Sequence, residues 1–146
     1  MHQIHQLSLS LYSSSRLLIQ LIQTSLNELN LTYPQFLVLS VLWDEDGLQV
    51  NEIGKRLYLD SGTLTPLLKK LEAMNYVKRQ RGTVDERTVY VELTYPGKSL
   101  QSKVQDVITP IDEKFIESLK IKAPDLNHSL SQLLESIEML KKDLTK

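Results

Sequence analysis

The tract from Leu59 to Glu72, LDSGTLTPLLKKLE, places small polar residues ahead of a regularly spaced apolar series. Asp60 and Ser61 are residues that cap helix N-termini, and the leucines that follow recur at helical spacing. A helix is therefore predicted from Ser61 to about Asn75, with an inward face of Leu64, Leu67, Leu68, Leu71 and Met74. Its first turn holds only small side chains, which predicts a close approach by another molecule.

A shorter helix is predicted just before this one. Leu48 to Val50 has the character of a short extended piece, and Asn51 is a residue that can cap a helix. The helix then runs from Glu52 to Leu59, with Ile53 and Leu57 on its core side. Two helices joined by a tight connection, the second opening on small polar residues, are typical of a helix-turn-helix.

A β-hairpin is predicted directly after these two helices. Apolar and polar residues alternate on both sides of a charged tip, which comprises residues 82 to 87. Alternation of this kind is the pattern of paired strands, and the glycine-containing tip is the turn between them. The fold class expected is mainly α with a small β-hairpin, the wing of a winged helix-turn-helix.

Further helices are predicted on both sides of this region. The N-terminal helix has one apolar face (Leu7, Leu11, Leu18, Ile22, Leu26 and Leu29) and a second one (Leu9, Leu17, Ile19 and Leu21). A helix that is apolar on two sides is expected to be buried between partners. Thr32 and Pro34 then open a helix that continues through Trp43.

Two helices are predicted after the hairpin. Thr94 caps the first, which runs towards Leu119 and should be kinked or broken at Pro110. The second starts at Ala123 and carries a regular seam of Leu126, Leu130, Leu133, Ile137, Leu140 and Leu144. This seam is interpreted as core and dimer interface rather than as a membrane-binding face, because the basic residues beside it are offset by acidic ones.

The charge of the chain is unevenly distributed. The net charge is −1, but residues 55 to 90 hold eight basic and four acidic residues, a local charge of +4. The rest of the chain therefore carries −5. Phosphate affinity follows local charge, so the basic middle predicts a nucleic-acid partner.

Composition excludes several classes of protein. With no cysteine, the chain forms no disulfide and no thiolate metal site. No metal centre or cofactor is expected, and His2 and His5 are interpreted as part of a frayed N-terminus. The chain lacks a nucleophile–base constellation and a glycine-rich phosphate loop, so an enzyme is not expected. Without a membrane-spanning run or a signal peptide, a soluble cytoplasmic protein is expected.

With these motifs in view, the chain resembles MarR-family transcriptional regulators. The resemblance is carried by residues 31 to 36 (LTYPQF), residues 57 to 72 (LYLDSGTLTPLLKKLE) and residues 85 to 87 (DER) in the wing. It covers nearly the whole chain and is nearest to the organic-hydroperoxide-sensing branch. It implies a homodimer built by the terminal helices, residues 1–30 and 96–146, and a DNA-binding lobe of residues 31–95, within one domain of 146 residues.

The hydroperoxide-sensing branch carries a cysteine near the start of its first helix, and Ser8 occupies that place here. Serine cannot form the sulfenic acid that a thiol switch requires. Of two tyrosines that bind the family's thiolate, one corresponds to Tyr33 and the other to Ile22, while Tyr12 corresponds to another family tyrosine. Ser8 is either an engineered replacement or a feature of a natural cysteine-free paralogue, and Ile22 favours the second.

The residues expected to contact duplex DNA lie on the second helix of the motif and on the hairpin. The hydroxyls and the slim first turn are expected in the major groove, the lysines on phosphates, and Arg87 in the minor groove, held by Asp85. The predicted set is Ser61, Gly62, Thr63, Thr65, Pro66, Lys69, Lys70, Lys78, Arg79, Arg81, Asp85 and Arg87.

The function predicted is that of a dimeric repressor that binds a pseudo-palindromic operator. Two alternatives remain open. In one, the regulator responds to a phenolic or other aromatic small molecule in a cavity lined by Ser8, Tyr12 and Tyr33, as the resemblance allows. In the other, the same fold is a protein-interaction module that does not bind DNA, which would have no need of a basic hairpin.

Overall fold

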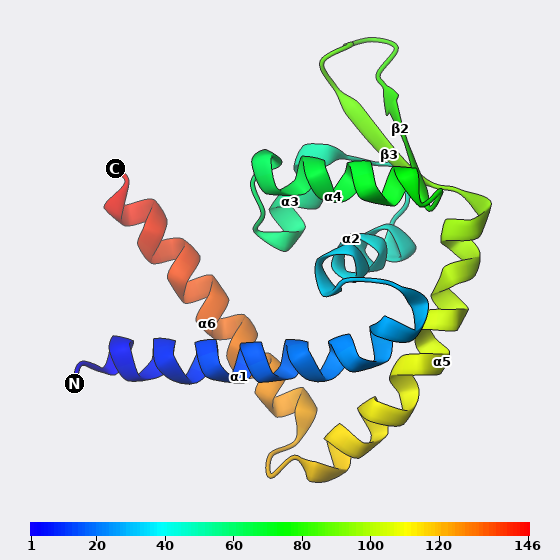
Figure 1. Ribbon diagram of the computed structural model, residues 1–146. Coiled ribbons are helices and arrows are strands. Elements are labelled where there is room, and N and C mark those ends of the chain that lie inside the picture. Colours follow the sequence, from blue (N-terminus) through cyan, green and yellow to red (C-terminus); the bar gives the residue numbers. More distant parts are fainter. The chain divides into compact units, whose positions relative to one another are not determined.

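The computed structural model describes residues 1–146 and consists of six α-helices, a 3-10 turn and three short strands (Figure 1). The elements follow the chain in this order: α1 Gln3–Leu26, η1 Asn27–Leu29, α2 Tyr33–Asp44, β1 Leu48–Gln49, α3 Val50–Leu57, α4 Ser61–Ala73, β2 Val77–Arg81, β3 Val89–Leu93, α5 Tyr95–Ser118 and α6 Ala123–Leu144. The chain divides into two compact units, Met1–Ile108 and Thr109–Lys146, which are described separately.

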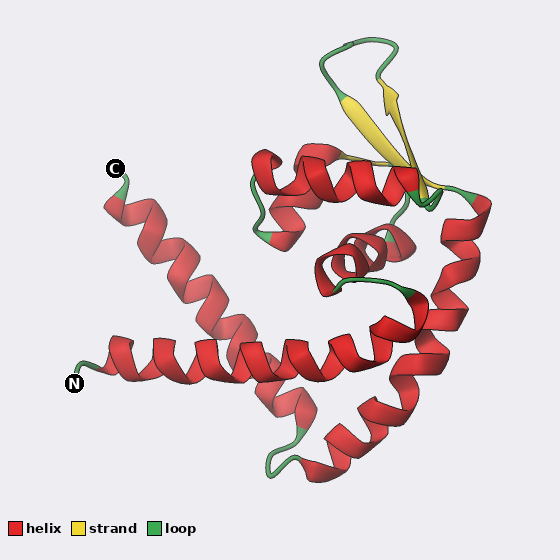
Figure 2. Ribbon diagram, viewed as in Figure 1, coloured by secondary structure: helices red, strands yellow, loops and turns green.

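The strands form one antiparallel sheet in the order β1-β3-β2 (Figure 2). In the hairpin, Val77 is opposite Leu93 and Arg81 is opposite Val89, so the predicted wing is confirmed with its tip at residues 82–88. Asp46 Oδ1 accepts hydrogen bonds from the amides of Gly47 (2.9 Å) and Leu93 (2.8 Å), which joins the turn before β1 to the end of β3.

The core of the first unit is formed by the helix-turn-helix, the sheet and the adjoining ends of α1 and α5. Its buried side chains are Leu26, Leu31, Val38, Leu39, Leu42, Leu48, Ile53, Leu64, Leu68, Leu71, Val77, Val91, Leu93, Leu100 and Val104. The leucine face predicted for α4 therefore lies in the core. In the second unit, α6 has no buried residue, and its seam residues Leu130, Ile137, Leu140 and Leu144 are exposed.

The expected bounds of α3 are wrong at both ends. The helix begins at Val50, and its cap is Gln49, whose amide donates to Glu52 Oε2 at 2.8 Å, whereas Asn51 already lies inside the helix. It ends at Leu57 because Tyr58 adopts the left-handed conformation. A reciprocal contact with a glutamate thus replaces the short side-chain cap that Asn51 was expected to supply.

A kink or a break is expected at Pro110, and the break does not occur, because α5 continues as one helix through that residue to Ser118. Proline removes one hydrogen bond, and a long helix tolerates that loss when the rest of its ladder is kept. The boundary between the two compact units falls between Ile108 and Thr109, one residue before this proline.

The other predicted helix starts are confirmed. Thr32 and Gln35 form a capping box at the start of α2. Thr94 Oγ1 accepts from the Gly97 amide at 3.1 Å and so caps α5. None of the helices combines the length and the apolar character that crossing a membrane requires.

Gln23 fastens the end of α1 to the start of α2. Its Oε1 accepts from the amide of Tyr33 at 2.8 Å, and its Nε2 donates to the carbonyl of Leu31 at 2.8 Å and to Asn27 Oδ1 at 2.9 Å. One side chain therefore satisfies two backbone groups in the partly buried connection between the helices. Leaving such groups without partners is more destabilising than losing an ordinary surface hydrogen bond.

We expect Gln23→Ala to lower the free energy of unfolding by about 2 kcal/mol, because the Tyr33 amide and the Leu31 carbonyl lose their partner. Urea unfolding followed by circular dichroism measures this loss. Gln20→Ala is the matched control, since Gln20 is an exposed glutamine one turn earlier on α1. Equal unfolding midpoints for the two variants would contradict the role given to Gln23.

Candidate nucleic-acid interface

The helix α4 has a buried face and an exposed face of opposite character. Leu64, Leu68 and Leu71 are buried, whereas the other side presents Ser61, Gly62, Thr63, Pro66, Lys69 and Lys70 to solvent, with Thr65 half-buried. No acidic residue occurs between Ser61 and Leu71. The core thus fixes the orientation of α4. The exposed face of this helix carries small residues in its first turn and Lys69 and Lys70 towards its C-terminal half.

Gly62 has no internal reason to be a glycine. A Cβ built at this position would meet only Asp60 Oδ1, at 3.4 Å. Alanine is the better helix residue, by roughly 0.5–1 kcal/mol in a helix interior. The small side chain is therefore explained better by an outside molecule approaching α4 than by packing within the chain.

The N-terminus of α4 is capped by Asp60. Asp60 Oδ1 accepts from the Thr63 amide at 2.8 Å, and the Asp60 carbonyl accepts from the Leu64 amide at 3.0 Å. Hydrogen bonds from the backbone of Thr63 lower the pKa of Asp60, so its charge stays at this end of the helix. This negative charge offsets the attraction of the helix dipole for an anion, whereas Lys69 and Lys70 carry no such local compensation in an ion pair.

Pro66 lies inside α4 without ending it. Because proline has no N–H, the carbonyl four residues earlier, that of Gly62, has no helical donor. Both residues are exposed. The exposed face therefore offers a backbone acceptor beside the hydroxyls of its first turn.

Two of the basic residues predicted to contact phosphate are held by acids. Lys78 Nζ lies 3.4 Å from Glu92 Oε2, its cross-strand neighbour. Arg79 Nη2 donates to Glu72 Oε1 at 3.1 Å, and the Arg79 amide donates to Glu72 Oε2 at 3.1 Å. The second pair joins the end of α4 to β2, and the hydrogen bonds from Arg79 lower the pKa of Glu72. The charges of Lys78 and Arg79 are therefore partly offset by neighbouring carboxylates.

Arg87 stands at the tip of the hairpin with 93% of its side chain exposed. Asp85 Oδ1 accepts from both the Arg87 amide (3.0 Å) and Arg87 Nε (3.3 Å), so a single carboxylate oxygen orients the backbone and the guanidinium. The tip is closed by the Thr88 amide, which donates to the Asp85 carbonyl at 3.1 Å. This pairing of Asp85 with Arg87 is the arrangement expected from the sequence.

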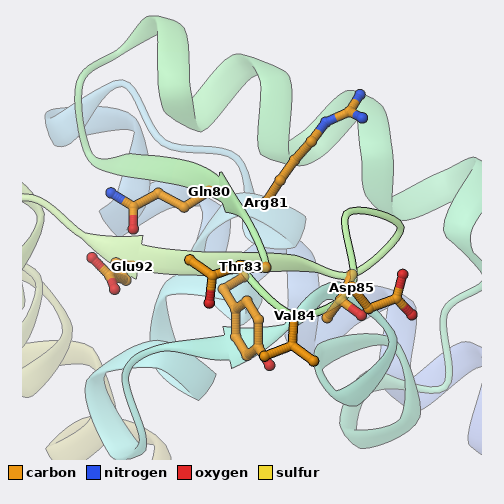
Figure 3. A pocket seen from close by; sticks show the side chains of 9 residues that line it. Gln80, Arg81, Thr83, Val84, Asp85 and Glu92 are labelled. Atoms are coloured by element: carbon orange, nitrogen blue, oxygen red, sulfur yellow. The ribbon is translucent and has the colours of Figure 1, made fainter.

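A hollow lies on the hairpin, and Figure 3 shows the side chains around it. The guanidinium of Arg81 extends away from the side chains of Thr83, Val84 and Asp85 in this view. Arg81 is in no ion pair, and the same is true of Lys69 and Lys70. The hollow belongs to the wing itself, since it is lined by Gln80, Arg81, Gly82, Thr83, Val84, Asp85, Thr88, Tyr90 and Glu92.

The three residues of the predicted effector cavity are separated within one chain. Ser8 is exposed and donates to the carbonyl of His5 at 2.9 Å, while Tyr12 is exposed with Arg16 over its ring. Tyr33 is half-buried, which raises the pKa of its phenol, and its amide is bound to Gln23. From Ser8 to Gln23 the helix rises about 22 Å. A cavity with both Ser8 and Tyr33 in its wall would therefore need a second chain.

One residue of this region has an unusual backbone conformation. Tyr58, in the turn between α3 and α4, is exposed and has a positive φ of 55°. A tight turn between two helices usually takes glycine at such a position. The chain has no group of three or more His, Cys, Asp or Glu residues that could hold a metal ion.

A short helix, a second helix with a buried leucine face and a following β-hairpin define the winged helix-turn-helix class of protein. A family model described as "Transcriptional regulator SarA/Rot" matches residues 20–107. The chain belongs to this family of MarR-like transcriptional regulators.

Known relatives agree with this assignment. The organic hydroperoxide resistance transcriptional regulator of Bacillus subtilis (strain 168) is 40% identical over 136 residues, which cover 91% of this chain and 90% of that protein. The HTH-type transcriptional regulator SarZ of Staphylococcus epidermidis is 42% identical over 110 residues, 75% of this chain and 74% of the relative. These relatives are transcriptional regulators, not enzymes.

Among solved structures, reduced AbfR bound to DNA is similar to this chain, with a TM-score of 0.80, 34% identity and coverage of 94% of this chain and 93% of that one. AbfR is a protein of Staphylococcus epidermidis. It has also been solved in a disulfide form, which is similar with a TM-score of 0.67, 35% identity and coverage of 98% and 92%.

Glu72→Gln should reduce stability near neutral pH by less than about 1 kcal/mol, as expected for an exposed ion pair. Because the folded state lowers the pKa of Glu72 below its ordinary 4.5, the contribution is present above that pH and is lost as pH falls through the lower, folded-state value. The difference from the wild type should therefore shrink below about pH 4.5. Urea midpoints measured across this range test the sign, with Glu86→Gln at the exposed tip as control.

Proposed function

We propose that this protein is a cytoplasmic, homodimeric repressor that binds a pseudo-palindromic operator in double-stranded DNA. The observation that carries the proposal is the exposed face of α4. Its leucines are buried, its first turn holds small residues without an internal steric reason, and Lys69 and Lys70 follow without an ion-pair partner. This combination suits a helix that lies in the major groove between two phosphate strands.

The contacts proposed for α4 follow from the chemistry of its side chains. Ser61, Thr63 and Thr65 offer hydroxyls to base edges and phosphates, and Gly62 allows the backbone close to the groove floor. The ring of Pro66 is suited to a thymine methyl group or a sugar. Lys69 and Lys70, one turn further on, are placed for phosphates.

The hairpin supplies the second part of the proposed interface. Arg87, oriented by Asp85 and almost fully exposed, is proposed to enter the minor groove. Arg81 is proposed to contact a phosphate because no acid holds it. Lys78 and Arg79 are paired with Glu92 and Glu72, so less of their positive charge is available to a phosphate. We therefore propose that they contribute little to DNA affinity.

A homodimer is proposed because two helices expose apolar faces. On α1, Leu7, Leu9, Leu17, Leu18 and Leu21 are exposed, and on α6 the seam residues and their neighbours are exposed as well. So many exposed leucines along a single helix are unusual on a soluble monomer. We therefore propose that residues 1–30 and 96–146 dimerise and that residues 31–95 bind DNA. A two-fold dimer would then read half-sites about one helical turn apart.

A thiol switch is chemically excluded in these residues, because they contain no cysteine. One relative takes its name from organic hydroperoxide resistance, and AbfR has been solved with a disulfide. This chain has the same fold, with Ser8 where the resemblance places the sensing thiol. We propose that any small-molecule effector acts without covalent chemistry, by shifting the population of DNA-competent dimers.

The proposed interface is tested by measuring operator binding as a function of salt concentration. Lys69→Ala should weaken binding of the gene's upstream region and reduce the slope of log affinity against log salt by about 1.8, since the dimer loses one phosphate contact in each protomer. Fluorescence anisotropy of a labelled duplex gives both quantities. Lys103→Ala is the matched control because Lys103 is exposed on α5, outside the proposed interface.

Light scattering on each variant shows whether it keeps twice the 16.8 kDa mass of one chain, so that a lost dimer is not mistaken for a lost contact. If the wild type binds no duplex specifically at moderate salt, the proposed function is wrong. If Lys69→Ala and Lys103→Ala change the salt slope equally, the face of α4 is not the interface.

We expect operator binding by the wild type to be unchanged by an organic hydroperoxide. A gel shift with and without cumene hydroperoxide is the measurement. Ser8→Cys is the matched comparison, because only a thiolate can be oxidised reversibly at that position under these conditions. Release of DNA from the wild type by hydroperoxide would show that the sensing chemistry resides in another residue.

A further inference from the structure

The helix α4 contains a proline beyond its first turn. The hydrogen-bond ladder of α4 begins with the Leu64 amide, which donates to the carbonyl of the cap Asp60 at 3.0 Å. Pro66 follows two residues later and lies inside the helix. A proline in the first turn replaces an amide that has no helical acceptor, whereas a proline at this point removes a bond of the ladder. The carbonyl that loses its donor is that of Gly62.

The Gly62 carbonyl belongs to the exposed face of α4. Gly62 and Pro66 are both exposed and lie one turn apart, hence on the same side of the helix. A Cβ on Gly62 would meet only Asp60 Oδ1, at 3.4 Å, so the chain leaves open space beside this residue. The regular helical pattern assigns the next amide, that of Leu67, to the carbonyl of Thr63. The Gly62 carbonyl is therefore an acceptor that the free protein leaves to water.

Binding in the major groove places a chemical demand on this carbonyl. As α4 enters the groove, the acceptor loses water, and a buried carbonyl without a donor is more costly than an ordinary hydrogen bond is favourable. Phosphate and deoxyribose oxygens within the duplex are acceptors and cannot meet the demand. On the base edges of the major groove, the donors are the N6 amino group of adenine and the N4 amino group of cytosine. The acceptor therefore discriminates among bases.

We propose that the Gly62 carbonyl, left free by Pro66, accepts a hydrogen bond from the amino group of an adenine or a cytosine and so reads one position in each operator half-site. The inference rests on the proposed operator binding. The hydroxyls beside it both donate and accept, so they suit any base edge, whereas a carbonyl only accepts. Pro66 is then a positioning residue as well as a ring that faces the groove, because it withholds the N–H that would occupy the carbonyl.

The test replaces single amino groups on the DNA. Footprinting first locates the half-sites in the gene's upstream region. Each adenine of one half-site is then replaced in turn by purine deoxyriboside, and each cytosine by 2-pyrimidinone deoxyriboside, which lack only the amino group. Fluorescence anisotropy of these duplexes gives the affinity of the full-length protein. At the position read by Gly62, the wild type should bind at least about fivefold more weakly, because its carbonyl loses a donor.

Pro66→Ala supplies an N–H to the Gly62 carbonyl within the helix. The melting temperature should be unchanged or higher, because alanine favours the helix interior that proline disfavours. The variant should bind the unmodified operator about fivefold more weakly, because the amino group loses its acceptor. The analogue at the read position should then change its affinity by less than about twofold, since the two changes remove the same hydrogen bond. The slope of log affinity against log salt should equal that of the wild type, because no charge changes.

Pro110→Ala is the matched control, since it repairs the corresponding bond in α5, outside the proposed interface. It should keep the wild-type sensitivity to every analogue. Uracil in place of thymine tests the ring of Pro66 against a methyl group separately. The inference is overturned if no analogue distinguishes the wild type from Pro66→Ala, or if the two differ only towards uracil. In those cases a wild type that still binds specifically preserves the proposed function, whereas a wild type without specific binding overturns both.

Discussion

Burial of the leucine face of α4 is the constraint on which the rest of the interface depends. Leu64, Leu68 and Leu71 are almost completely withdrawn from solvent, each with at most 1% of its surface exposed. Burying a leucine contributes about 1.5–3 kcal/mol, so these three fix the rotation of the helix about its axis. The same rotation directs the hydroxyls and lysines outward. The end of the helix then positions the hairpin, because Glu72 binds both the backbone and the guanidinium of Arg79.

Much of this arrangement could be predicted from the sequence because its signals are local. The leucine spacing of α4, the alternation in the hairpin, and the caps at Thr32 and Thr94 each depend on residues within a few positions of one another. The start of α3 was misplaced because the effective cap is a contact between Gln49 and Glu52 and not a short polar side chain. Its end was misplaced because the conformation of Tyr58 is imposed by the turn and is not a preference of tyrosine.

The electrostatics of the candidate site were harder to predict, because they depend on pairs that only the folded chain creates. Lys78 faces Glu92 across the hairpin, a pairing set by strand register. Arg79 meets Glu72 across a tertiary contact. The Asp60 side chain accepts from the Thr63 amide, so its negative charge is held at the start of α4. A count of basic residues thus overestimates the positive charge available to a partner. Among the basic residues predicted to contact DNA, those without an ion pair are Lys69, Lys70 and Arg81, fewer than the count indicates.

The strand order gives the basic hairpin a second consequence. Because β3 lies in the middle of the sheet, β2 is an edge strand along the whole length of the hairpin. Its sequence from Lys78 to Arg81 contains three cations and a glutamine. Charged side chains on an edge strand disfavour pairing with the strand of another molecule. The cationic edge therefore disfavours aggregation of the protein through its own wing. This effect matters when the protein is not bound to a partner.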